Sequence, residues 1–317
     1  MDIVSIGETM VLFTPHTQGQ MRYSRNYSSR IAGAETNTLI GLAKLGHKVG
    51  WISRVGKDEF GEFIISTVRG EGVDVSQVTI DNEAQTGIFF KEMMNEKNIR
   101  MYYYRKLSAA SNLAPSHIDE DYIANSKYLY VTGITPALSE TCRESIFYAI
   151  ELAKKHDKKV VFDPNIRRKL WNDEEARNTL LAIAERSDIV LPGINEGRFL
   201  FGTDKCEKIS ALFHQIGVES VIIKLGEKGA YFSTPVETDY IEGFKVERVV
   251  DPVGAGDGFA AGLLSGFLDE KTISESVQRG CAVGAMVTTV SGDIEGLPNR
   301  EMLNSFIQSP RDEDISR

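Results

Sequence analysis

A run of small residues ending in a carboxylate, Gly254-Ala255-Gly256-Asp257, is the part of the chain best suited to chemistry. Apolar residues recur over 259–268 at the spacing of one helix face, and a strand-like stretch precedes the run at 249–250. We therefore expect a loop that leads from a strand into a helix N-terminus, where backbone N–H groups and the helix dipole favour a phosphate. In the first helical turn, Asp257 could accept a proton from an attacking hydroxyl. A plain turn with Asp257 as a helix N-cap explains the same spacing equally well.

Three other nucleotide-binding patterns fit the sequence less well. Residues 256–261 match the loose dinucleotide pattern G-x-G-x-x-A, but they lie too late in the chain for the remaining strands of a nicotinamide-binding unit. No acidic residue at the end of a second strand follows about 20 residues later. The sequence also lacks the G-x-x-x-x-G-K-[ST] loop of the Walker ATPases and the protein-kinase signatures.

The elements that must position this loop follow an alternating pattern from about residue 128 onward. Apolar runs with many β-branched residues predict buried strands, and amphipathic spacing between them predicts helices. The predicted strands are 128–133, 159–163, 188–191 and 220–224, and the predicted helices include 139–156 and 173–186. This pattern indicates an α/β fold with an open, doubly wound and mostly parallel sheet flanked by helices.

Two segments, at about 10–31 and 85–106, contain strand-like stretches without a helix between them. In the second, residues 86–91 and 99–105 flank a polar turn at 95–98, which predicts a hairpin. We expect these segments to form a small antiparallel β lid over the α/β body. No linker divides the chain, so we expect one domain over 1–309, followed by a solvated tail at 310–317.

Composition excludes several classes of protein. The 317 residues carry 45 acidic against 36 basic side chains, a formal net charge of −9, which argues against binding to nucleic acid. No apolar run is long enough to span a membrane. Three widely spaced cysteines and an N-terminus without a signal-peptide pattern favour reduced thiols and a cytoplasmic location.

Several ordered motifs together resemble those of the ribokinase-like (PfkB) carbohydrate kinases. Residues 251–257, Asp-Pro-Val-Gly-Ala-Gly-Asp, resemble that family's C-terminal signature, usually written D-T-x-G-A-G-D. Residues 33–46 and 55–61 resemble its N-terminal signature. The resemblance extends from Gly7 to about Pro298, and it implies a ribokinase-like fold with a β lid, ATP as phosphoryl donor and Mg²⁺.

The resemblance also implies roles for particular residues. It makes Asp257 the general base, which we expect to stay ionised at the helix N-terminus, and it makes the amides of Gly254, Ala255 and Gly256 an anion hole. It implies that Glu196 binds the metal. It also implies a nucleotide-binding set of residues, namely Asn165, Lys224, Gly226, Gly229, Gly254 and Gly256. The chain departs from the family pattern at Pro252, Gly193 and Cys281, where relatives usually carry threonine, asparagine and asparagine.

The substrate is indicated by residues of the lid and of one strand end. Along a strand, residues two apart share a face, so Met101, Tyr103 and Arg105 point together. A second cation, Arg167, follows the strand at 159–163, and guanidinium groups bind carboxylates through paired hydrogen bonds. Together these features resemble 2-keto-3-deoxygluconate kinases.

That resemblance implies ATP-dependent phosphorylation of the terminal hydroxyl of a sugar acid. It implies that the sugar hydroxyls are bound by Gly33, Ala34 and Asn37. It implies that the carboxylate end of the sugar is bound by Tyr103, Arg105 and Arg167. Phe89 stands where relatives often carry a lid tyrosine. Three alternatives stay open: a kinase for a neutral ketose such as fructose, a non-catalytic sugar or nucleotide sensor on the same fold, and a dinucleotide-dependent oxidoreductase. Exposed aromatic residues of the lid also favour a homo-oligomer.

Overall fold

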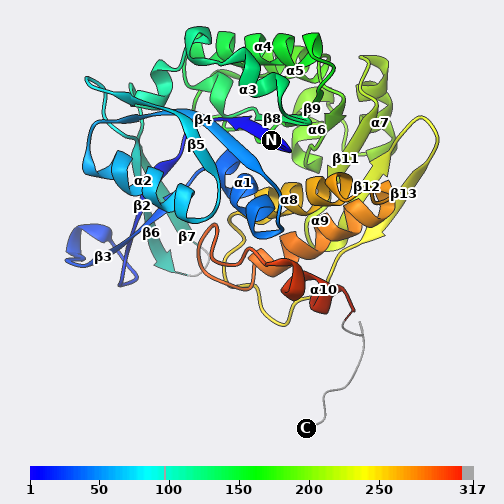
Figure 1. Cartoon of the computed structure of the whole chain (residues 1–317). Coiled ribbons are helices and arrows are strands. Elements are labelled where there is room, and N and C mark those ends of the chain that lie inside the picture. The colour runs from blue at the N-terminus through cyan, green and yellow to red at the C-terminus, as the bar shows by residue number, and fades with distance from the viewer. Residues whose placement is uncertain (96–97, 309–317) are drawn as a thin grey trace.

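A nine-stranded sheet forms the centre of the protein (Figure 1). The computed structural model describes residues 1–95 and 98–308. In the order β13-β12-β11-β10-β9-β8-β1-β4-β5, neighbouring strands are parallel except in the pairs β11–β12 and β12–β13. The strands are β1 (Ile3–Ile6), β4 (Val49–Gly56), β5 (Asp74–Asp81), β8 (Tyr128–Thr132), β9 (Lys159–Asp163), β10 (Ile189–Val190), β11 (Ser220–Lys224), β12 (Gly229–Ser233) and β13 (Thr238–Glu242). The predicted open, mostly parallel α/β sheet is confirmed.

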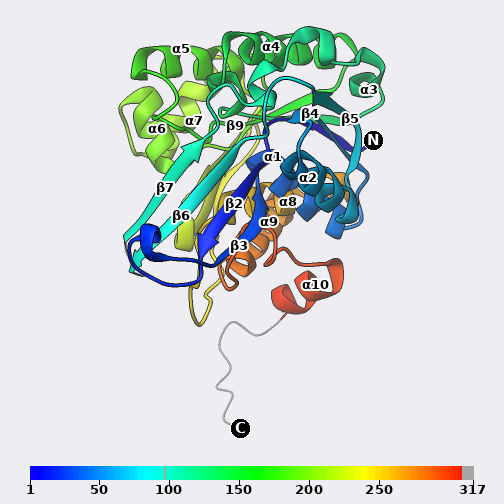
Figure 2. The same ribbon diagram turned by 90° about the vertical axis from the view of Figure 1, so that its left-hand side faces the viewer.

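Helices cover both faces of this sheet (Figures 1 and 2). One face packs against α1 (Ala34–Lys44), α2 (Glu59–Gly70), α8 (Ala255–Leu268), α9 (Ile273–Val287) and α10 (Arg300–Gln308). The other packs against α3 (Glu120–Ala124), α4 (Glu140–Lys155), α5 (Asp173–Ala184), α6 (Ile194–Phe201) and α7 (Cys206–Gln215). Short 3₁₀ turns lie at Met21–Tyr23, Ala109–Asn112, Pro115–His117, Thr135–Ala137 and Gly226–Lys228.

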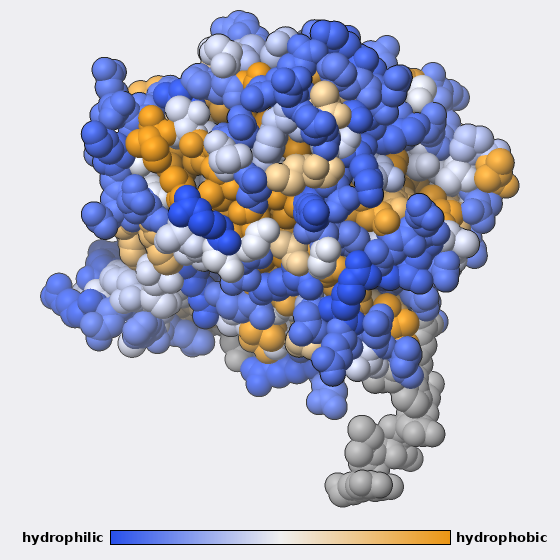
Figure 3. Space-filling view, in the orientation of Figure 1, coloured by the Kyte–Doolittle hydropathy of each residue, from blue (hydrophilic) through white to orange (hydrophobic). Residues whose placement is uncertain are grey.

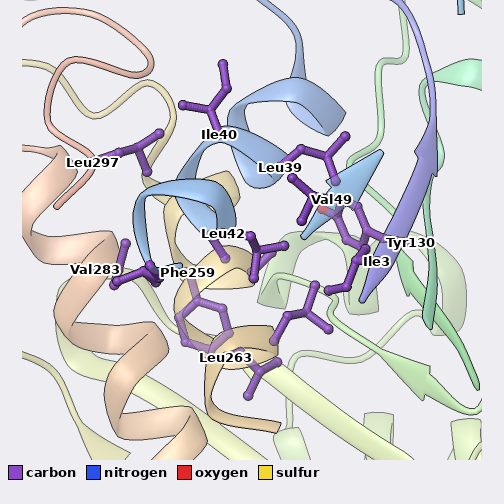
Figure 4. Close-up of a cluster of buried hydrophobic side chains, with 14 of the residues drawn as sticks. Ile3, Leu39, Ile40, Leu42, Val49, Tyr130, Phe259, Leu263, Val283 and Leu297 are labelled. Atoms are coloured by element: carbon purple, nitrogen blue, oxygen red, sulfur yellow. The ribbon is translucent and has the colours of Figure 1, made fainter. Parts of the chain in front are cut away.

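Alternation along the strands divides the core between the two faces. In β1, Ile3 belongs to the cluster under α1 and α8, whereas Val4 and Ile6 belong to the cluster under α4 and α5. Figure 4 shows Phe259 and Leu263 of α8 packed into the first cluster. This packing fixes α8, and with it the loop at its N-terminus.

A second, four-stranded sheet forms the lid, in the order β3-β2-β6-β7 (Figure 2). Its strands are β2 (Met10–Pro15), β3 (Tyr27–Ala32), β6 (Ile88–Asn95) and β7 (Asn98–Tyr104). The pairs β2–β3 and β6–β7 are antiparallel, and the central pair β2–β6 is parallel. The predicted lid and its hairpin are confirmed, although residues 96–97 of the turn and the predicted tail at 310–317 lie outside the described residues.

Agreement with the predicted elements is close in the body of the fold and fails beside the glycine loop. Strands β9 and β11 begin and end at the predicted residues, whereas the strand expected at 249–250 is absent. There Val249 and Val250 are 56% and 50% exposed in a loop between β13 and α8.

Polar residues dominate the face of the molecule seen in Figure 3. Within residues 1–95 and 98–308, no helix has the length and apolar character needed to cross a bilayer.

Candidate active site

A cavity of about 790 Å³ lies between the lid and the carboxyl ends of the central strands. That edge is where ligands bind in open α/β sheets. The lid contributes apolar, aromatic and cationic side chains, namely Met10, Leu12, Phe89, Lys91, Met101, Tyr103 and Arg105. The body contributes strand ends, loops and helix N-termini, including Glu8, Asp163, Lys224, residues 252–254, Gly256 and Asp257.

The glycine loop reaches the cavity at the N-terminus of α8. Gly254 is the N-cap, with a φ of 80°, and a Cβ there would lie 2.8 Å from the backbone oxygen of Asp293. Only glycine meets both conditions without strain. The first N–H groups of a helix have no partner within it, although that of Ala255 donates to the Pro252 oxygen at 3.4 Å. Gly254 and Gly256 line the cavity, so this helix start is suited to an anion.

Asp257 is the third residue of α8, so it is not the N-cap. It is 9% exposed, and its Oδ2 accepts a hydrogen bond from Asn37 Nδ2 at 2.8 Å. Burial raises the pKa of Asp257 to about 7, opposed by the Asn37 hydrogen bond and reinforced by the charges of Asp163 and Asp293. Burial therefore opposes the ionisation that we expected from the position of Asp257 at the helix N-terminus. A carboxyl that titrates near neutral pH is better matched to general-base catalysis.

Asn37 also lies close to a second carboxylate, Asp293, in the loop after α9. Its Nδ2 is 3.4 Å from Asp293 Oδ2, and burial raises the pKa of Asp293 to about 6. Among the described residues, Asn37 Oδ1 is buried without a hydrogen-bond partner. This oxygen could accept a hydrogen bond from a hydroxyl of a bound sugar, so the role of Asn37 stays a prediction.

Charged groups at the ends of β9 and β11 meet on the opposite side of the cavity. Lys224 Nζ lies 2.5 Å from Asp163 Oδ2, which is fully buried. Burial opposes the charge of Lys224, but Asp163 and Glu196 outweigh it and raise the lysine pKa. A cation held here beside Gly256 is available to phosphate oxygens.

Glu196 does not have the environment expected of a metal ligand. One of its oxygens accepts the N–H of Gly193 at 2.7 Å and the other that of Ile166 at 2.9 Å. Burial raises the pKa of Glu196. Nowhere in residues 1–95 and 98–308 do three or more acidic, histidine or cysteine side chains gather as a metal site. These residues would suit a Mg²⁺ ion whose ligands are chiefly the phosphates of the nucleotide and water molecules.

Beneath the lid, Arg105 forms a buried ion pair with Glu8, the residue two positions after β1. Ser108 Oγ donates to the other carboxylate oxygen of Glu8 at 2.5 Å. Phe89 stacks on Tyr103, with ring centroids 5.2 Å apart. The charge of Arg105 is thus compensated within the protein, which the sequence did not indicate.

Arg167 is in a different state. It lines the same cavity from the segment after β9, is exposed, and its charge lowers the pKa of Asp257. In the described part of the chain it has no ion pair, whereas the neighbouring Arg168 pairs with Asp173. Arg167 is therefore the cavity cation most open to an anionic ligand.

The structure brings most of the predicted site residues together and leaves two outside. Those that line the cavity are Gly33, Ala34, Asn37, Tyr103, Arg105, Asn165, Arg167, Glu196, Lys224, Gly226, Gly254, Gly256 and Asp257. Ala255 and Gly229 do not belong to this lining. Gly229 has a φ of 101°, and a Cβ there would lie 2.0 Å from the oxygen of Ile241, so the pairing of β12 with β13 requires this glycine. Cys281 is buried in α9 within the core.

Four charged cavity residues were missing from the predicted set: Glu8, Lys91, Asp163 and Asp293. Position at a strand end could have indicated Glu8 and Asp163. Alternation with Phe89 could have indicated Lys91, because both lie on the cavity face of β6. Asp293 lies in a loop and carries no such signal.

A helix start suited to an anion, a buried carboxylate and a polar cavity under a lid are the features that phosphoryl transfer to a small hydroxylated molecule would require. Residues 1–300 match the family described as pfkB family carbohydrate kinase. The chain belongs to this family and is a sugar kinase with the ribokinase-like fold.

Three relatives place the chain more closely. It is 41% identical over 313 residues to the 2-dehydro-3-deoxygluconokinase of Bacillus subtilis, covering 98% of this chain and 97% of that protein. It is 34% identical over 306 residues to the 5-dehydro-2-deoxygluconokinase of Bacillus velezensis, covering 94% and 91%. A crystal structure from E. coli, of a protein assigned only provisionally as ribokinase II, contains ATP and Mg²⁺. It superposes with a TM-score of 0.89 at 27% identity and covers 97% of this chain and 99% of that one.

Proposed function

We propose that this sugar kinase transfers the terminal phosphoryl group of ATP to the terminal hydroxyl of 2-keto-3-deoxygluconate, also called 2-dehydro-3-deoxygluconate. One observation carries the proposal. The cations Arg105 and Arg167 line the same cavity as Asp257 and the start of α8. An elongated sugar acid held at its carboxylate would direct its far end towards the base. The name of the Bacillus subtilis relative supports the same substrate.

The acid end of the substrate would lie against Arg167 and the inner face of the lid. A guanidinium has five donors, and Arg105 uses part of its set on Glu8. Its Nε is buried without an acceptor among the described residues. The substrate carboxylate would therefore take its charge compensation from Arg167 and a directional hydrogen bond from Arg105. Tyr103 would form the wall beside the sugar.

At the other end, the chain's own groups would carry the transfer. Asp257 accepts the proton of the terminal hydroxyl while that oxygen bonds to the terminal phosphorus of ATP, and ADP leaves with the electrons of the broken P–O bond. The amides at Gly254 and Gly256 stabilise the charge that develops on the phosphoryl oxygens. Lys224, Gly226 and Asn165 hold the nucleotide. Mg²⁺, when bound, neutralises phosphate charge.

The Glu8–Arg105 pair favours a second candidate, the phosphorylation of a neutral ketose such as fructose. A cation that is already neutralised selects less strongly for an acid. The name of the Bacillus velezensis relative indicates a different sugar acid, 5-keto-2-deoxygluconate, as a further possible substrate. A non-catalytic sensor is the least favoured alternative, because the glycine loop and Asp257 are intact.

Release of ADP in a coupled assay with ATP and Mg²⁺ tests the proposal. The panel is 2-keto-3-deoxygluconate, its galactonate epimer, 5-keto-2-deoxygluconate and fructose. We expect kcat/KM to be highest for 2-keto-3-deoxygluconate and ³¹P NMR to place the phosphate on its terminal oxygen. Faster turnover of fructose would replace this function by the second candidate, and no ADP release with any sugar would favour the sensor.

Self-association of the chain stays a prediction, and the outer face of the lid is the surface we propose for it. Tyr102 and Tyr104 there are 37% and 62% exposed. Sedimentation of the wild type beside Tyr104→Ser tests this: a monomeric wild type would contradict it.

A further inference from the structure

A lysine of the lid is buried against the loop that carries the anion-binding amides. Lys91 Nζ, on β6, lies 2.6 Å from Asp251 Oδ2, and each side chain is only 7% exposed. Asp251 precedes α8 by four residues, and its other oxygen accepts the N–H of Val253 at 3.2 Å. The lid therefore contacts the glycine loop through a buried ion pair.

A second cation of the lid, Arg30, forms polar contacts with the loop that follows α9. Arg30, on β3, donates from Nη1 to the Ser291 oxygen at 2.8 Å and pairs through Nε with Glu295 at 3.1 Å. Asp293 lies between these two residues. Its backbone oxygen is close to Gly254, and its carboxylate contacts Asn37. Both loops beside the start of α8 are thus fastened to the lid.

Stability alone explains the buried pair poorly. Removing two charges from water is costly, so a buried ion pair often stabilises a fold no more than an apolar pair of the same size. What such a pair does fix is geometry, because the 2.6 Å contact between Lys91 Nζ and Asp251 Oδ2 holds only while β6 and the loop keep their relative positions. Any displacement of β6 must move the loop or break the pair.

We propose that Lys91 and Arg30 are positioning residues that couple the lid to the anion hole, so that sugar bound under the lid strengthens nucleotide binding at α8. This inference rests on the anion-binding role proposed for residues 254–256. Because coupling between two ligands is reciprocal, bound nucleotide strengthens sugar binding by the same factor.

The double variant Lys91→Met, Asp251→Asn tests the coupling without leaving a buried charge unpaired. Asparagine at 251 can still accept the N–H of Val253. The affinity for a non-hydrolysable ATP analogue with Mg²⁺ is measured by calorimetry, with and without saturating 2-keto-3-deoxygluconate or whichever panel sugar the wild type phosphorylates. We expect sugar to tighten nucleotide binding at least ~5-fold in the wild type and at least about twofold less in the double variant, in which Arg30 still contacts the neighbouring loop.

Two further measurements separate coupling from folding. The double variant should keep a Tm within about 4 °C of the wild type. Arg100→Gln is the matched control, because Arg100 is an exposed lid cation, 3.9 Å from Glu92, that touches neither loop. It should retain the wild-type coupling.

The proposal is overturned if the double variant keeps the wild-type coupling, or if the wild type shows none. Should the double variant not fold, Arg30→Gln decides the matter at a half-exposed position, with the coupling expected to fall at least about twofold. The ADP-release assay on the wild type judges the proposed function separately.

Discussion

The two ends of the cavity treat charge in opposite ways. Under the lid, Arg105 is paired with Glu8, so a cation and an anion cancel inside the protein. At α8, Asp257 and Asp293 share the single amide of Asn37, and burial raises the pKa of both. The pair under the lid is compensated, whereas the α8 end also holds, beside the Lys91–Asp251 and Lys224–Asp163 pairs, two carboxylates whose pKa values lie near neutral pH.

This difference suits the two ends of the cavity to different tasks, with substrate binding under the lid and phosphoryl transfer at α8. A compensated pair holds its geometry and can offer directed hydrogen bonds without attracting every anion. A buried carboxylate with a raised pKa lowers the stability of the fold when ionised, yet gains basicity. Arg167 lines the same cavity, has no ion pair among the described residues, and would supply the remaining charge for the acidic substrate that we propose.

The largest expected effect comes from removing the carboxylate that we propose as the general base. Asp257→Asn should lower kcat by at least ~10²-fold, the scale of general-base catalysis, with little change in nucleotide affinity. Stopped-flow turnover and calorimetry with an ATP analogue measure the two quantities. Near-normal turnover would remove Asp257 from the reaction.

The second largest effect is expected from removing Arg167, the cavity cation that has no ion pair among the described residues. Arg167→Ala should raise KM for 2-keto-3-deoxygluconate about 10- to 100-fold, the range for a hydrogen bond to a charged group, and leave KM for fructose nearly unchanged. Arg168→Ala is the control, since Arg168 pairs with Asp173. Equal losses for both sugars would argue against a carboxylate contact.

A smaller effect is expected where charge is already compensated. Glu8→Gln leaves Arg105 without its carboxylate partner, so binding of an acid should improve relative to a neutral ketose, by up to about tenfold in the ratio of kcat/KM values. Ser108→Ala removes only a hydroxyl contact to Glu8 and is the control. A ratio that stays at the wild-type value would show that Glu8 does not limit selectivity.

The smallest expected effect is a change in pH dependence. Asp257 acts as a base only when deprotonated, so kcat/KM should fall about tenfold per pH unit below its pKa of about 7 and level off above it. Because the charge of Asp293 raises that pKa, Asp293→Asn should move the midpoint to lower pH. A midpoint that moves upward would contradict this electrostatic account.

The body of the fold was predictable because burial on both faces gives strands a distinctive sequence. Strands β9 and β11 are apolar runs, and their bounds agree with the prediction. Val249 and Val250 are β-branched like the residues of β9 and β11, but they are exposed and form no strand. Residue propensity alone does not distinguish an exposed segment from a buried one. The parallel pairing of β2 with β6 joins segments far apart in the chain, so no local pattern encodes it.

Most of the residues predicted from the recognised motifs line the cavity, but the sequence did not predict their electrostatic states. Sequence placed Arg105 and Asp257 in the cavity, but a pKa depends on burial and neighbours that only the fold brings together. Glu8 neutralises Arg105 from a strand end nearly a hundred residues away. Asp293 reaches Asn37 from a loop without any pattern.

The most direct test of the account compares 2-keto-3-deoxygluconate with its carboxamide, which has nearly the same shape and no charge. We predict that the wild type phosphorylates the acid with a kcat/KM at least about tenfold higher, and that Arg167→Ala removes most of this preference. Equal kcat/KM values for acid and amide in the wild type would contradict the claim that the cavity selects a sugar by its carboxylate.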